Sequence, residues 1–228
     1  EDIKVCKGVP SGIAMITVSH KGENAITVAS GANGELSAAD LEEAEEAFEE
    51  ADYMLVQLES PLETVQKAVE LCAEFETRVI LNPAPAADLK DEILGKVDIL
   101  TPNETEAEKL TGTKVHDEGS AQKAAKALHE RGIQTVIITL GSQGAFLSDA
   151  ASGQQKLIPG FSVEAMDTTA AGDVFNGQLA VALAEGHGLE EAIQMSHAAA
   201  ALSVKKLGAQ SSIPGREETD KFLKEQSS

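Results

Sequence analysis

The sequence predicts an α/β fold in which helices cover both faces of a mostly parallel sheet. From Ser37 onward, short runs of Val, Ile and Leu alternate with longer amphipathic segments, as strands joined by single crossover helices do. These short runs are apolar almost throughout, which is typical of strands buried on both sides. With 228 residues the chain can form a full core as one domain or two. We find no linker and predict one domain, 1–228.

The start of the chain predicts a β-hairpin. The segments 12–18 and 25–28 are rich in β-branched residues, and the polar segment 19–24 between them reads as a turn. We therefore expect residues 1–34 to contribute a small β appendage to the domain.

The alternation then predicts the elements in order. Expected strands lie at 53–58, 78–81, 97–100 and 135–139, and expected helices at 38–51, 61–76, 89–95, 104–111 and 118–131. After Gly144 we expect a meander at 145–148, 155–158 and 161–165, helices at 173–185 and 189–206, and a loop at 208–215.

A net charge of −20 argues against binding to nucleic acid or to anionic membrane surfaces, because both need clustered Lys and Arg. Much of the acidic excess lies between Glu42 and Asp52. There, Leu41, Ala44 and Phe48 recur at helical spacing, so the acids predict the solvated face of an amphipathic helix.

No apolar run approaches the roughly 20 residues that span a bilayer, so we expect no membrane association. The two cysteines, Cys6 and Cys72, show no disulfide or metal-binding pattern, and a reducing cytoplasm is the expected location.

The segment Asp167–Gly177 carries the strongest chemical signal. Ala170, Ala171 and Gly172 would let an anion approach the free N–H groups of a helix start, and Asp173 could take a proton from an attacking hydroxyl. This combination predicts phosphoryl transfer. An alternative is that Asp173 only caps the helix, since Asp is a favoured N-cap residue.

Polar residues recur at the carboxyl ends of successive predicted strands, where open α/β sheets bind ligands. They are Glu59, Asn82, Asn103, Glu104, Glu106, Gly141 and Gly144. Taken singly, Glu59 and Asn103 could be caps, Glu106 a solvated acid, and 141–144 a hairpin turn.

We find no P-loop, no dinucleotide-binding glycine motif, no H-E-x-x-H and no G-x-S-x-G. His197 is expected at a surface or pocket edge.

Several segments resemble the ribokinase family of carbohydrate kinases, in the same order along the chain. They are 57–61 (QLESP), 82–85 (NPAP), 101–106 (TPNETE), 139–144 (TLGSQG), 167–177 (DTTAAGDVFNG) and 208–210 (GAQ). The resemblance covers essentially the whole chain. It implies a ribokinase-like three-layer α/β/α sandwich with a small β lid, and ATP-dependent phosphorylation of D-ribose to D-ribose 5-phosphate.

The resemblance also implies roles for individual residues. Asp173 would be the general base, the N–H groups of Ala170, Ala171, Gly172 and Asp173 the anion hole, and Glu59 a sugar ligand. The expected ATP contacts are Asn103, Thr139, Leu140, Gly141, Ser142, Gln143, Gly144, Gly172 and His197. Glu106 would orient hydrated Mg²⁺. A monovalent cation, expected to be K⁺, would lie among Asp167, Thr169, Ser203, Lys206, Gly208 and Ser212. The lid would form a homodimer in the full-length protein.

The sequence departs from the family pattern at its start. The family has further strands and a Gly-rich sugar-binding segment, G-G-x-x-x-N, before anything that matches Glu1, and this sequence does not contain that segment. We therefore expect a partial fold that lacks N-terminal strands. A kinase for another sugar or a nucleoside, and a non-catalytic remnant that binds nucleotide, remain as alternatives.

Overall fold

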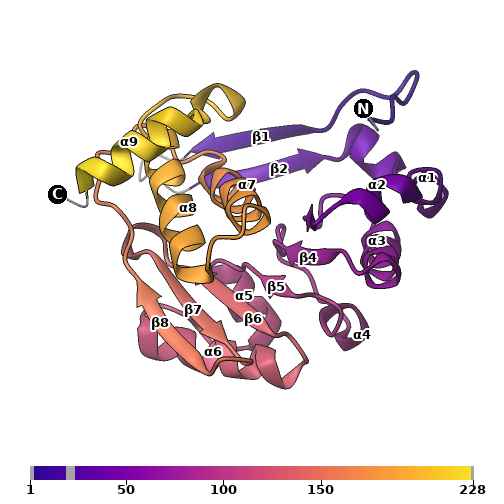
Figure 1. Ribbon diagram of the computed structural model, residues 1–228. Coiled ribbons are helices and arrows are strands. Elements are labelled where there is room, and N and C mark those ends of the chain that lie inside the picture. The colour runs from indigo at the N-terminus through magenta and orange to yellow at the C-terminus, as the bar shows by residue number, and fades with distance from the viewer. Residues whose placement is uncertain (1–2, 19–23, 227–228) are drawn as a thin grey trace.

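The computed structural model describes residues 3–18 and 24–226, and a six-stranded sheet forms its middle layer (Figure 1). The strand order is β3-β4-β5-β6-β7-β8. β3 (Tyr53–Val56), β4 (Arg78–Leu81), β5 (Ile99–Leu100) and β6 (Thr135–Thr139) run parallel to one another. β7 (Ala145–Asp149) and β8 (Gln154–Ile158) complete the sheet as an antiparallel meander. The predicted mostly parallel α/β fold is confirmed.

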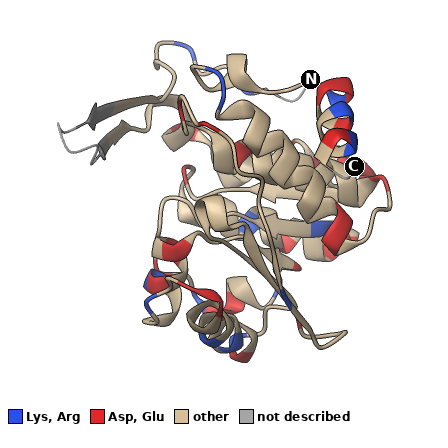
Figure 2. Ribbon diagram, turned by 90° about the vertical axis from the view of Figure 1, so that its left-hand side faces the viewer, with Lys and Arg blue, Asp and Glu red and all other residues tan. Residues whose placement is uncertain are grey.

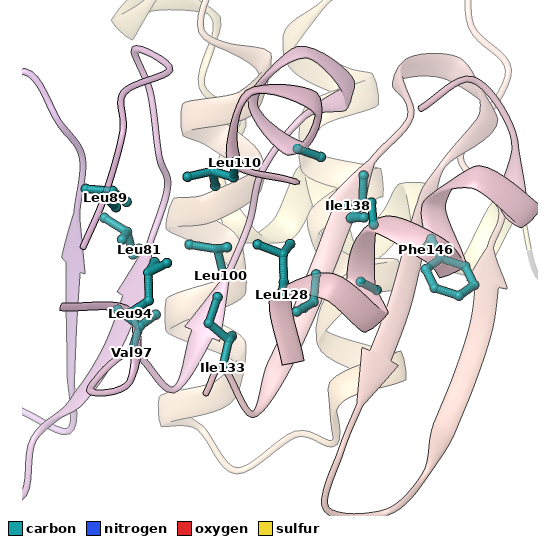
Figure 3. Packing of buried hydrophobic residues seen from close by; sticks show 14 of the residues in the cluster. Leu81, Leu89, Leu94, Val97, Leu100, Leu110, Leu128, Ile133, Ile138 and Phe146 are labelled. Atoms are coloured by element: carbon teal, nitrogen blue, oxygen red, sulfur yellow. The ribbon is translucent and has the colours of Figure 1, made fainter. Parts of the chain in front are cut away.

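The helices form the two outer layers. They are α1 (Ala38–Glu42), α2 (Glu45–Glu50), α3 (Leu62–Phe75), α4 (Asp91–Leu94), α5 (Glu104–Thr111), α6 (Glu118–Glu130), α7 (Ala171–Ala184), α8 (Leu189–Ser203) and α9 (Arg216–Gln226). Because neighbouring side chains of a strand point to opposite faces, each strand supplies two cores. Leu81 and Ile138 pack under α3–α6 (Figure 3), whereas Ile80 and Ile137 pack under α7 and α8.

The N-terminal hairpin is a separate two-stranded sheet. β1 (Ile13–Val18) and β2 (Asn24–Ala29) pair antiparallel with Ile13 opposite Ala29, and they project from the α/β body (Figure 1). Both strands agree with the predicted ones within one residue. Most of the predicted turn, 19–23, lies outside the described residues. A short 3₁₀ turn, η1 (Gly31–Glu35), leads into α1.

The predicted single helix over 38–51 is wrong, because α1 and α2 are separated by a turn at Glu43 and Ala44. The acids of this stretch are divided between the two short helices, with Asp40 and Glu42 in α1 and the others of the helical part in α2. Figure 2 shows that Asp and Glu are spread over several helices.

Two predictions near the C-terminus also differ from the structure. The predicted strand at 161–165 is absent within the described chain, and Phe161 instead packs edge-on against Phe222 of α9, with ring centroids 5.1 Å apart. β8 is the edge strand of the sheet, and this segment does not extend the sheet beyond it. α9 itself was not predicted.

None of the helices in the described ranges is long and apolar enough to cross a membrane.

Candidate active site

The amino end of α7 lies against the carboxyl ends of β3 and β4. Gln57, directly after β3, donates from Nε2 to Asp173 Oδ1 of α7 at 2.8 Å and to Asn82 Oδ1, directly after β4, at 3.2 Å. Thus Asp173 and Asn82, 91 positions apart in the printed sequence, share one hydrogen-bond donor. Asn82 was a candidate from its place at a strand end, but Gln57 was not. The expected strand 53–58 enclosed Gln57, whereas β3 ends at Val56; a polar residue near the end of an apolar strand run was the signal that could have indicated it.

The start of α7 has the geometry that an anion site needs. Its N-cap is Ala170, in the left-handed conformation with φ 59° and ψ 11°. No atom lies within 4 Å of the place where a Cβ on Gly172 would stand, so a ligand can approach the backbone there. The N–H groups of a first helical turn have no partner four residues back. That of Ala171 bonds instead to Thr168 O at 3.3 Å.

The N-cap interpretation of Asp173 is wrong. α7 begins at Ala171, two residues earlier than predicted, which makes Asp173 the third residue of the helix. Three residues with little or no side chain allow the chain to turn into the helix early. A cavity of about 390 Å³ opens beside Asp173, between α7 and the segment 209–214.

Asn103 and Glu106 form a reciprocal cap on α5. Asn103 Oδ1 accepts from the Glu106 N–H at 2.9 Å, and Glu106 Oε2 accepts from the Asn103 N–H at 2.8 Å. Burial raises the pKa of the Glu106 carboxyl, whose residue is 6% exposed. The backbone also pairs Asn103 with Thr139, where β6 ends. The structure therefore brings these three predicted site residues together.

The segment Thr139–Gly144 connects β6 to β7 through a 3₁₀ turn, η2 (Gly141–Gln143), closed by the Leu140 N–H bonding to Gly144 O at 2.8 Å. The hairpin-turn reading of this segment is correct. Gly144 has φ 108°, and a Cβ there would stand 2.1 Å from Ile158 O. Only glycine fits this position.

His197 is buried in α8, 7% exposed, so of the two expected positions the surface one is wrong. α8 places the imidazole against Phe175, with ring centroids 5.2 Å apart. The ring donates one hydrogen bond to the backbone carbonyl of Ile158, while Nε2 has no partner among the described residues. Burial lowers the pKa of His197 to about 4. The ring is therefore neutral and holds one unpartnered nitrogen.

We expect His197 to make stability depend on pH between about 6.5, the usual histidine pKa, and about 4. In that window the unfolded chain binds the proton that the folded chain excludes, so stability falls as pH falls. The full loss is on the order of 3 kcal/mol. Urea unfolding of wild type and His197→Gln at pH 7.5 and 4.5 checks this. Parallel loss of stability in both proteins would contradict the assignment.

Asp167 joins the segment before α7 to the loop after α8. Its carboxylate accepts from the Thr169 N–H at 3.0 Å and the Gly208 N–H at 2.9 Å. The hydrogen bonds of the Thr169 side chain and of the Gly208 and Thr169 backbone lower the pKa of Asp167 to about 2. Two other residues expected at the cation site, Ser203 and Ser212, are buried. A third, Lys206, forms an ion pair with Glu218, with Nζ 3.1 Å from Oε2.

Glu59 follows β3 by three residues and contacts the segment after the hairpin. It is exposed, and its Oε2 is 3.5 Å from Asn33 Nδ2 of η1. The contact connects the segment after the hairpin to the end of β3.

Comparison with known proteins gives consistent matches. A family model described as pfkB family carbohydrate kinase matches residues 2–216. The chain is 51% identical over 213 residues to a protein of Haemophilus influenzae named ribokinase, covering 93% of this chain and 69% of that protein.

Two solved structures are similar over most of this chain. That of ribokinase from Thermotoga maritima has a TM-score of 0.82 at 43% identity, over 95% of this chain and 70% of that one. That of Arabidopsis thaliana ribokinase complexed with ribose and ATP has a TM-score of 0.86 at 30% identity, with the same two coverages.

Proposed function

The chain belongs to the pfkB family of carbohydrate kinases, and we propose that it works as a ribokinase, transferring the γ-phosphoryl group of ATP to D-ribose. The observation that carries the proposal is the position of Asp173. Its carboxylate lies in the first turn of α7, beside the open surface at Gly172 and the ends of β3 and β4. A base and an anion-binding helix start stand together, as phosphoryl transfer to a hydroxyl requires.

In the proposed reaction, Asp173 accepts the proton of the sugar's primary hydroxyl. The hydroxyl oxygen then bonds to the γ-phosphorus while the bond from that phosphorus to the β–γ bridging oxygen breaks, and ADP leaves. The negative charge on the transferring group is stabilised by the N–H groups of Ala170, Gly172 and Asp173. The Ala171 N–H joins them after its hydrogen bond to Thr168 O is broken. Glu59 accepts hydrogen bonds from the sugar.

The nucleotide side of the site comprises the elements that meet beyond β5 and β6. Asn103 and the turn 139–144 bind ATP, and the neutral His197 lies near the adenosine, its unpartnered Nε2 able to accept a hydrogen bond. Glu106, in the N-x-x-E arrangement, orients hydrated Mg²⁺. It fits that role because its carboxyl is fixed by two hydrogen bonds from Asn103, from the backbone N–H to Oε2 and from Nδ2 to Oε1. Mg²⁺ supplies charge neutralisation between the phosphates.

The experiment is ADP production from MgATP with D-ribose, deoxyribose, other pentoses and nucleosides, each compared with no acceptor. Turnover with ribose above all others supports the proposal, and preference for another acceptor supports the related kinase. Calorimetry tests the second candidate. ATP binding without ribose binding or ADP production would identify a nucleotide-binding remnant.

We propose K⁺ as the monovalent cation between Asp167 and the loop 203–212. The loop fits a cation because Asp167 stays ionised, with its pKa at about 2, and because Met166 and Asp167 N–H both bond to Val204 O, closing the two segments around the site. Replacing K⁺ by Na⁺ at constant ionic strength is expected to lower kcat several-fold in wild type. Asp167→Asn should remove this difference. Equal kcat in both salts would contradict the assignment.

We propose that residues 1–34, with β1 and β2, form the lid and that the lid makes a homodimer. Its exposed apolar side chains include Ile13, Met15 and Val28, more than half exposed. Light scattering after size exclusion should report a dimer for wild type and a monomer for Met15→Lys. A wild-type monomer at micromolar concentration would overturn this part of the proposal.

A further inference from the structure

Gln57 is the centre of a chain of side-chain amides that ends on the proposed base. Asn82 Nδ2 donates to Thr101 O at 3.0 Å, Gln57 Nε2 donates to Asn82 Oδ1 at 3.2 Å, and the same Nε2 donates to Asp173 Oδ1 at 2.8 Å. Thr101 and Asn82 are buried, 1% and 8% exposed. The chain therefore runs from the sheet interior to the active site.

The buried end fixes the direction of every hydrogen bond in this chain. A backbone carbonyl only accepts, so Asn82 must turn its NH₂ group toward Thr101 O and its Oδ1 toward Gln57. Gln57 must then turn its own NH₂ group toward Asn82. The two N–H bonds of that group point to Asn82 Oδ1 and Asp173 Oδ1, and Gln57 can only be a donor to the base.

The backbone on both sides of Gln57 is also fixed. The Asn82 N–H bonds to Val56 O at 2.9 Å, and the Leu58 N–H bonds to Ala84 O at 2.8 Å. These bonds continue the pairing of β3 and β4 beyond the strand ends. Gln57 thus reaches toward α7 from a rigid part of the sheet.

In two other helices, α5 and α1, an acid at the third helical position folds back onto its N-cap, although Asp40 of α1 also pairs with Lys4. Glu106 of α5 bonds to the N–H of its N-cap at 2.8 Å, and Asp40 of α1 does the same at 2.8 Å to Ser37. Asp173 is the third residue of α7, yet its bond goes to Gln57, 116 positions away in sequence. A carboxylate that folded back would cover the N–H of Ala170 and point away from the sugar.

We propose that Gln57 is a positioning residue that holds the carboxylate of Asp173 away from the N–H groups of α7, with Oδ2 turned to the acceptor hydroxyl. This inference depends on the proposed role of Asp173 as the base. Gln57 takes no part in the proton transfer. It sets where the carboxylate stands and leaves the helix start open to the phosphoryl group.

The test uses Gln57→Leu, which keeps the bulk of the side chain and removes the donor. We expect kcat to fall by about 10- to 100-fold, as for a base displaced by about 1 Å, while the Kd of ADP, measured by calorimetry, stays within about 2-fold. Asn82→Ala should lower kcat less, and should add almost nothing when combined with Gln57→Leu, because both act through one chain of contacts. Gln66→Leu on α3, which loses only a bond to Glu70, is the matched control and should keep wild-type kcat.

A crystal structure of Gln57→Leu decides the proposal independently of turnover. We expect the Asp173 carboxylate to lie within hydrogen-bond distance of the Ala170 N–H. A carboxylate that keeps its wild-type position, or wild-type kcat in Gln57→Leu, would overturn the proposal. If wild type phosphorylates no acceptor, the proposed function fails, and the crystal structure still tells whether Gln57 positions Asp173.

Discussion

Asp173→Asn is expected to lower kcat for ribose phosphorylation by about 10²- to 10⁴-fold, the usual contribution of a general base. The substituted amide has nearly the shape of the carboxylate, and its oxygen still accepts the hydrogen bond that Gln57 donates at 2.8 Å. It cannot take the hydroxyl proton. The change therefore removes the chemistry and preserves the geometry.

Steady-state kinetics with ribose and MgATP, together with the Kd of ADP, measure this effect. ADP affinity should stay within about 3-fold, because the loss falls on the chemical step rather than on nucleotide binding. Asp52→Asn, an exposed acid before β3, is the control. Wild-type kcat in Asp173→Asn would show that another group takes the proton.

Leu179→Ala is expected to lower the free energy of unfolding by about 2–5 kcal/mol, the usual cost of a cavity in a packed core. Leu179 is fully buried on the face of α7 that packs with Ile80, Ile137 and Phe175. The cavity would lie directly under the helix that carries Asp173. The effect should thus fall on the stability of the core beneath α7.

Urea unfolding followed by circular dichroism measures the loss. Val181→Ala is the matched control, since Val181 lies on the same helix but is 43% exposed, and it should cost less than about 1 kcal/mol. A loss below about 1 kcal/mol for Leu179→Ala would mean that the core closes around the missing methyl groups.

The fold class could be predicted because its signal is local. Alternating apolar runs and amphipathic segments encode β3 to β6 and the helices between them, and the predicted strand at 135–139 has the observed bounds. The errors lie where a local pattern competes with a distant constraint. The apolar spacing near Phe48 predicted one helix, but a turn at Glu43 and Ala44 divides it into α1 and α2. The extended-looking segment 161–165 has no strand beside it in the described structure.

The candidate site was predictable in part for the same reason. Small residues before an acid predicted the anion site at the start of α7, and the carboxyl ends of the strands predicted Asn82, Asn103 and Glu106. Asp173 was wrongly assigned as the N-cap, because the backbone conformation decides where a helix begins. The left-handed conformation of Ala170 makes that residue the N-cap. The burial of His197 was not predicted, because it depends on contacts with Phe175 and with the end of β8 that no local pattern reveals.

The sequence alone determined the architecture and singled out the start of α7 as the candidate site, because periodicity and residue type are properties of neighbouring positions. Only the tertiary structure decided that Gln57 meets Asp173 across 116 positions, that Asn103 pairs with Thr139, and that Asp167 reaches Gly208. A hydrogen bond forms within about 3 Å and in one direction, so it depends on how the packed sheet and helices bring distant atoms together.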